Sequence, residues 1–83
     1  MEFVSTKDLY QTSDIALGSV LLSYGLKLEA VDKSNPKAVF CFRWEKGIEQ
    51  LAEGFWTHNL QVDPLLYFNS LKELKTRLYQ DIK

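Results

Sequence analysis

Apolar and polar positions near the N-terminus predict a short strand followed by a helix. Residues 2–4 are apolar enough for a brief strand. Ser5 and Asp8 have the spacing of a capping box, in which the Ser5 hydroxyl accepts a hydrogen bond from the Asp8 amide and the Asp8 carboxylate reaches back. We therefore expect a helix that begins at Ser5 and ends at Tyr24, with Gly25 as its left-handed stop.

This predicted helix has a weak middle and two apolar sides. Residues 11–14 are polar, and Thr12 or Ser13 is a candidate cap at which the helix restarts. One apolar face at helical spacing consists of Ala16, Leu17, Val20, Leu21 and Tyr24. A second side is formed by Ile15, Gly18, Ser19 and Leu22. A helix that is apolar on two sides is buried on two sides, so it is either the central helix of the domain or part of an interface.

Two later segments alternate with the period of a β-strand. In residues 26–31 one face is formed by Leu26, Leu28 and Ala30. In residues 38–44 the aromatic side chains of Phe40, Phe42 and Trp44 share one face, and Val39, Cys41 and Arg43 share the other. Because residues 32–37 are polar and contain an Asn-Pro breaker, the two segments are predicted to form an antiparallel hairpin.

The rest of the chain predicts two helices. Residues 45–58 carry an apolar stripe of Ile48, Leu51, Ala52, Phe55 and Trp56. Asp63 and Pro64 are a cap and a first-turn proline, which begin a last helix. Its stripe comprises Tyr67, Leu71, Leu74, Leu78 and Ile82, widened by Leu65 and Phe68.

Together these elements predict one small α+β domain over residues 1–83. An antiparallel β-hairpin, with residues 2–4 as a candidate third strand, packs against three helices in the order β-α-β-β-α-α. A chain of 83 residues supports one domain and a modest core, so self-association is a natural supplement to its stability.

Composition narrows the class of protein. Hydrophobic residues make up 46% of the chain and charged residues 25%, which is too apolar for a disordered protein. A net charge of -1 does not fit a protein that coats DNA. One cysteine, no signal-peptide pattern and no apolar run long enough for a membrane span predict a cytoplasmic protein with no membrane association.

Candidate chemistry for catalysis is sparse. The single cysteine, Cys41, lies between two phenylalanines, and the single histidine, His58, lies at a predicted helix end. A Cys–His dyad is one reading, but a small buried cysteine and a dipole-complementing histidine account for both residues. One Cys and one His cannot supply a zinc site, and the scattered glycines form no phosphate-binding loop. We therefore expect no enzyme activity, no metal and no cofactor.

Surplus apolar positions suggest a surface for a protein partner or for self-association. The candidate residues are Ile15, Gly18, Ser19, Leu22, Leu66 and Tyr79. The apolar members fall off the main stripes, and the two small residues permit the close approach of another backbone. The alternative is a core that wraps around more of each helix. The favoured hypothesis is a non-catalytic protein-binding or accessory module, with a homodimer as one form of it.

The second hypothesis is a nucleic-acid-associated accessory protein. Its candidate residues are the aromatic Phe42 and Trp44 and the basic Lys72, Lys75 and Arg77. Exposed aromatic side chains on a sheet stack on bases, and a basic helix contacts phosphates. The alternative is that the aromatic face is core and that the helix is a solvated surface with intrahelical ion pairs.

The chain also resembles an uncharacterised family of short bacterial and phage proteins, a domain of unknown function. The resemblance is carried by Ser5–Tyr10, Leu21–Leu28, Val39–Phe42, Phe55–Trp56, Asp63–Pro64 and Leu74–Lys75. Gly54 and His58 are candidate departures from the pattern. The resemblance implies a stand-alone domain from a microbe or its virus and brings no catalytic residues.

Overall fold

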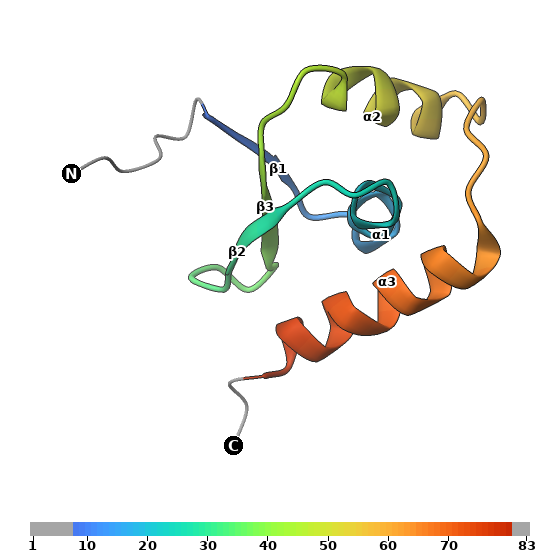
Figure 1. Ribbon diagram of the computed structural model, residues 1–83. Helices are drawn as coiled ribbons and strands as arrows, with labels where there is room; N and C mark the ends of the chain where they lie inside the picture. The colour runs from blue at the N-terminus through green and yellow to red at the C-terminus, as the bar shows by residue number, and fades with distance from the viewer. Residues whose placement is uncertain (1–7, 81–83) are drawn as a thin grey trace.

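The computed structural model describes residues 8–80 as a three-stranded antiparallel sheet and three helices (Figure 1). The strands are β1 (Leu9–Thr12), β2 (Leu28–Asp32) and β3 (Val39–Arg43). The helices are α1 (Ile15–Ser23), α2 (Ile48–Trp56) and α3 (Pro64–Leu78). The α+β class and the order β-α-β-β-α-α are confirmed.

The central strand of the sheet is β3, and the order is β1-β3-β2. The predicted hairpin is β2 with β3. Across this pair the Arg43 Nε lies 2.7 Å from a carboxylate oxygen of Glu29. In the turn after β2, the Asp32 carboxylate accepts hydrogen bonds from the Ser34 amide at 2.9 Å and the Ser34 hydroxyl at 2.7 Å. The hydroxyl and amide of Ser34 hold the pKa of Asp32 below its ordinary value.

The third strand is not where the sequence placed it. Residues 9–12 form β1 and pair with β3, whereas the sequence assigned them to the first helix. Local capping signals were outweighed by tertiary pairing, because the free edge of β3 offers backbone partners to a segment that contains tyrosine and threonine. The candidate strand at residues 2–4 and the cap at Ser5 lie outside the described residues.

The first helix therefore begins later than expected, at a cap that the sequence pattern did not predict. The Asp14 carboxylate accepts hydrogen bonds from the amides of Ala16 at 2.8 Å and Leu17 at 3.1 Å. Asp14 is thus the N-cap in place of Thr12 or Ser13. At the other end Gly25 has a φ of 92°, which supplies the left-handed stop as predicted.

Helix α1 is the centre of the domain. In Figure 1 it is seen nearly end-on, with the sheet on one side, α2 above it and α3 below it. It packs most extensively against α3 and also contacts α2 and β1. Its two apolar sides are therefore both used inside the chain, which confirms the central-helix alternative.

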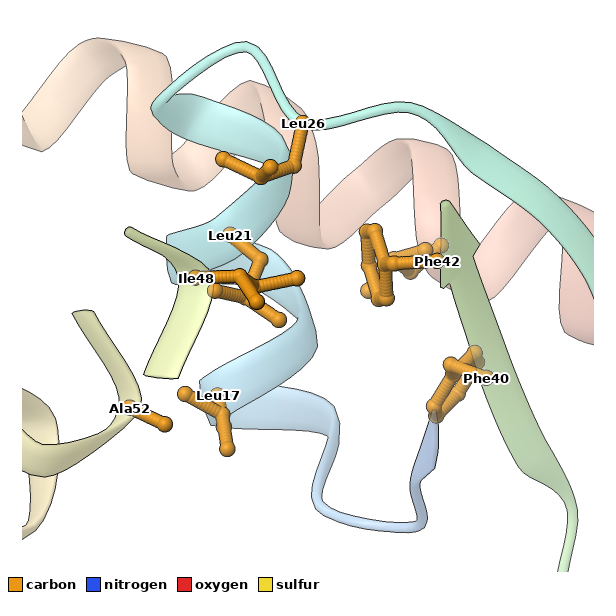
Figure 2. Packing of buried hydrophobic residues seen from close by; sticks show 8 residues of the cluster. Leu17, Leu21, Leu26, Phe40, Phe42, Ile48 and Ala52 are labelled. Carbon is orange, nitrogen blue, oxygen red and sulfur yellow. The ribbon is translucent and has the colours of Figure 1, made fainter. Parts of the chain in front are cut away.

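The core forms where α1 meets α2, α3 and the inner face of β3 (Figure 2). Its buried members are Leu17, Leu21, Leu26, Phe40, Phe42, Ile48, Ala52 and Leu74. On β2 the expected alternation is shifted by a bulge between Leu28 and Ala30, so Val31 packs on the core and Ala30 is exposed.

The last helix begins as the sequence predicts. The Asp63 carboxylate accepts hydrogen bonds from the amides of Leu65 at 2.9 Å and Leu66 at 3.1 Å, and Pro64 occupies the first turn. Leu74 is fully buried, but Leu65 and Phe68 are 66% and 55% exposed, so they do not widen the core stripe as expected. Among the helices of residues 8–80, none combines the length and the apolar character that a membrane crossing requires.

Candidate functional site

Two of the residues predicted to bind a partner lie in the interior. A Cβ added to Gly18 would lie 3.0 Å from Leu74 Cδ1, so the close approach that this glycine permits is made by α3. Ser19 is fully buried, and its hydroxyl donates to the Ile15 carbonyl at 2.8 Å. The small residues of α1 were therefore wrongly assigned to an outer surface, because the chain's own helix covers them.

The other four candidates do not form one surface either. Ile15 and Leu22 are half-buried and pack against the core. Leu66 and Tyr79 are exposed by 52% and 59%, but they lie at opposite ends of α3. Ile15 and Tyr79 both line an open cleft beside the β2–β3 turn, whereas Leu66 belongs to the other end of α3.

The aromatic strand is not a platform for bases. Phe42 is fully buried and faces α1, so its assignment to a nucleic-acid surface was wrong. Trp44 lies just after β3 and is 44% exposed. Lys72, Lys75 and Arg77 lie on the C-terminal half of α3, whereas Trp44 follows β3, so the basic and aromatic candidates belong to different elements.

An apolar hollow of the described chain lies between the end of α2 and the start of α3. We call it the α2–α3 groove. It has a volume of about 490 Å³, and its apolar walls include Val20, Phe55, Trp56, Leu60, Val62 and Tyr67. The ring centroids of Trp56 and Phe55 lie 4.8 Å apart in an edge-to-face arrangement. Trp56 is 57% exposed. A large aromatic side chain therefore stands in contact with water at the edge of an apolar hollow.

The end of α2 shapes this groove. The Asn59 amide donates to the Gly54 carbonyl at 2.8 Å, and the His58 amide donates to the Phe55 carbonyl at 3.3 Å, which together make a Schellman stop. Leu60 then packs on Gly54, where a Cβ would lie 2.9 Å from Leu60 Cγ. The segment between α2 and α3 is also hydrogen-bonded to the end of α1, because the Tyr24 hydroxyl donates to the Gln61 carbonyl at 2.5 Å.

Exposed apolar side chains also lie on the first turns of α3. Leu65, Leu66 and Phe68 are each more than half exposed, and Tyr67 between them lines the groove. The Nζ of Lys72 lies 5.3 Å from the centre of the Phe68 ring. Of these residues the sequence pattern predicted only Leu66 as a surface position, because Leu65 and Phe68 fit the core stripe of the helix.

One wall residue of the groove has a strained backbone. His58 has a φ of 62°, in the left-handed region that favours glycine. We expect His58→Gly to raise the free energy of unfolding by about 0.5–1 kcal/mol, because relief of the left-handed strain exceeds the added entropy of the unfolded chain. Urea denaturation followed by circular dichroism measures this change.

The neighbouring Thr57 is the matched control, since its φ of -95° suits any residue. Thr57→Gly should lower the free energy of unfolding by about 0.5–1 kcal/mol. If both glycine variants shift stability in the same direction, the left-handed turn at His58 is not the source of the effect.

The cysteine and the histidine do not meet in a catalytic arrangement. Cys41 is a free, buried thiol on β3, and the Gln11 amide group lies 3.7 Å from its sulfur. Burial raises the pKa of the Cys41 thiol above its ordinary value, which disfavours the reactive thiolate. His58 lies instead in the groove at the end of α2. Within residues 8–80 no cluster of three or more His, Cys, Asp or Glu side chains is placed to hold a metal ion.

These features define a small α+β domain with an exposed apolar groove between its last two helices. The chain belongs to the DUF5659 family, a domain of unknown function, whose family model matches residues 7–80. This agrees with the resemblance to an uncharacterised family that the sequence indicated. No curated protein and no solved structure gives a significant match to the chain.

Proposed function

We propose that this protein is a non-catalytic binding module that holds an apolar segment of a protein partner in the α2–α3 groove. The observation that carries the proposal is the exposure of Trp56 at the edge of an apolar hollow of about 490 Å³. Tryptophan side chains that border a pocket are frequent anchors of protein interfaces.

The surface around the groove fits such a partner. Leu65, Leu66 and Phe68 are exposed on the first turns of α3, next in sequence to Tyr67, which lines the hollow. Exposed apolar area is typical of interaction sites. Burying several of these side chains removes apolar surface from water, which contributes about 25 cal/mol per Å². The partner is therefore expected to present leucine or aromatic side chains on one face.

Self-association is the second form of this proposal. Leu65, Leu66 and Phe68 lie on the first turns of one helix, so a two-fold pairing of α3 would cover them with the same residues of a second copy. Sedimentation equilibrium distinguishes the two forms. A wild-type dimer that Leu66→Ser converts to a monomer supports self-association. If the wild type is a monomer, the expected partner is a different protein.

A peptide-display selection on the immobilised protein tests the proposal. Selected peptides should carry leucine or aromatic anchors, and their affinity should fall about tenfold or more in Leu66→Ser, which corresponds to about 1.4 kcal/mol. The matched control is Tyr79→Ser, because Tyr79 is also more than half exposed but lies at the far end of α3. Peptides that bind both variants as well as the wild type, or a selection that enriches none, would contradict the proposal.

We also propose a cytoplasmic location and a microbial or phage origin. The location is supported by the single cysteine, which is a buried free thiol and has no second cysteine with which to pair. The origin is supported by the resemblance to short bacterial and phage proteins described above. The lack of catalysis is supported by the raised pKa of Cys41 and by its contact with Gln11 in place of a histidine.

A further inference from the structure

The walls of the α2–α3 groove come almost wholly from a part of the chain that contains no lysine or arginine. Apart from Val20, the residues that line the groove belong to residues 54–67. Between Gly47 and Leu71 the sequence has three acidic residues and one histidine, and all ten lysine and arginine residues lie elsewhere. This segment therefore has a formal charge of -3 with its histidine neutral, whereas the rest of the chain has +2.

The acidic side chains belong to the two helices that border the groove. Glu53 and Glu49 are exposed on α2, one and two turns before Trp56, so helical spacing places them on the same face as its exposed ring. Asp63 is exposed at the start of α3, one turn before Tyr67, whose amide donates to the Asp63 carbonyl at 2.9 Å. An apolar hollow is thus flanked by negative charge on both helices.

Two of these carboxylates are available to a partner. Neither Glu53 nor Asp63 forms an ion pair with another residue of the described chain. The Asp63 carboxylate caps α3 as the acceptor of two amide hydrogens, and the positive end of the helix dipole offsets part of its charge. The negative character of the groove therefore depends on the α2 carboxylates as well as on Asp63.

The cations nearest along the chain do not cancel this charge. Lys46 comes directly after Glu45, so this pair sums to zero. Lys72 lies on α3, with its Nζ 5.3 Å from the centre of the Phe68 ring. With these residues included, the formal charge of residues 45–72 is still -2. A segment that enters the groove therefore approaches negatively charged surroundings.

We propose that the partner segment held in the α2–α3 groove is cationic and amphipathic, with lysine or arginine side chains beside its leucine or aromatic anchors. This inference rests on the proposed function, since it describes the partner of the same groove. The anchors fill the hollow beside Trp56, and the cations lie near Glu53 and Asp63. Charges at the edge of an apolar interface mainly raise the rate of association and select against partners of the same sign.

The same charge disfavours a second copy of this chain as the occupant. A two-fold interface brings the same surface of both copies together. Pairing across the groove would place Glu49, Glu53 and Asp63 of one copy against those of the other, and like charges that face each other weaken association. Charge complementarity therefore selects a different protein, one whose apolar segment is basic.

The composition of peptides selected by display on the immobilised protein tests the inference. Enriched peptides should contain more lysine and arginine than the unselected library, in addition to their apolar anchors. An enriched peptide resynthesised with glutamine in place of its lysine and arginine should bind about tenfold more weakly at about 50 mM salt. The difference should shrink to about twofold at about 500 mM salt, because salt screens charges at an exposed edge.

The double variant Glu53→Gln/Asp63→Asn tests the same charges on the protein and keeps the helix cap, since asparagine caps as well as aspartate. It should bind the basic peptide about fivefold more weakly and the glutamine version within about twofold of the wild type. The charge-matched control is Glu29→Gln/Asp32→Asn, because both residues lie on β2, which contributes no lining residue to the groove. This control should bind both peptides within about twofold of the wild type.

The outcomes separate this inference from the proposed function. If the selection enriches no peptide, the proposed function fails and the inference fails with it. If it enriches apolar peptides without an excess of lysine and arginine, the groove remains a binding site but the cationic partner is overturned. Equal losses of affinity in the two double variants would overturn it as well.

Discussion

Replacing Phe42 with alanine is expected to remove about 3–5 kcal/mol from the free energy of unfolding. Phe42 is fully buried on β3, and its ring faces Leu21 of α1 across the core (Figure 2). The cavity left by the ring adds to the lost transfer free energy, because β3 is held on both edges and cannot collapse onto it. A loss of this size approaches the total stability of a small domain. Urea denaturation followed by circular dichroism measures it.

Trp44→Ala is the control for this prediction. Trp44 follows the same strand and is 44% exposed, so its replacement should change the free energy of unfolding by less than about 1 kcal/mol. The comparison also tests the corrected assignment of the aromatic strand. If Phe42→Ala melts like the wild type but loses affinity for oligonucleotides, the strand is an exposed platform and the account of the core is wrong.

Leu74→Ala is expected to lower the free energy of unfolding by about 2–5 kcal/mol. Leu74 is the fully buried residue of α3, and its Cδ1 would lie 3.0 Å from a Cβ at Gly18. This contact brings the backbone of α1 close to α3, the most extensive packing between two elements of the fold. Removing the side chain leaves a cavity on the glycine that no neighbouring Cβ can fill. The midpoint of thermal unfolding should fall accordingly.

The matched control is Leu65→Ala on the same helix. Leu65 is 66% exposed, so its replacement should alter stability by no more than about 0.5 kcal/mol. Equal losses in the two variants would mean that α3 is not packed on α1 through Leu74.

The sequence was informative where local signals and tertiary packing agree. The hairpin follows from the alternation around Phe40 and Phe42, and the last helix follows from Asp63 and Pro64. In both places a single local signal selects one backbone conformation, and burial of the same side chains reinforces it. Gly25 is a third example, because its positive φ is required where α1 ends.

The N-terminal part was mispredicted because two caps compete there. Ser5 and Asp8 satisfy the capping pattern, yet residues 9–12 pair with β3 and the helix begins after Asp14. Whether a polar segment continues a helix or joins a sheet depends on the free edge of another strand, which no local pattern contains. The bulge of β2 is a similar case, since it moves Val31 rather than Ala30 onto the core.

The candidate surfaces could be predicted only in part, because each joins residues that are distant in the sequence. Leu66 was recognised as surplus to its stripe, but the groove beside it depends on how α2 ends at His58. Lys75 was predicted as a basic surface residue, but it lines the same cleft as Lys37 only because the β2–β3 turn lies close to the end of α3. Gly18 was predicted to contact a partner, whereas it permits the close approach of Leu74 from α3.

The most direct test of the central claim is amide chemical-shift mapping on the nitrogen-15-labelled protein with a peptide from the display selection. The account predicts that shifts concentrate in residues 54–68 and spare the amides of residues 32–37 and 75–80. It also predicts that Leu66→Ser abolishes these shifts while the spectrum remains that of a folded domain. Shifts spread over the hairpin and the C-terminal end of α3, or shifts that persist unchanged in Leu66→Ser, would contradict the assignment of the α2–α3 groove as the binding site.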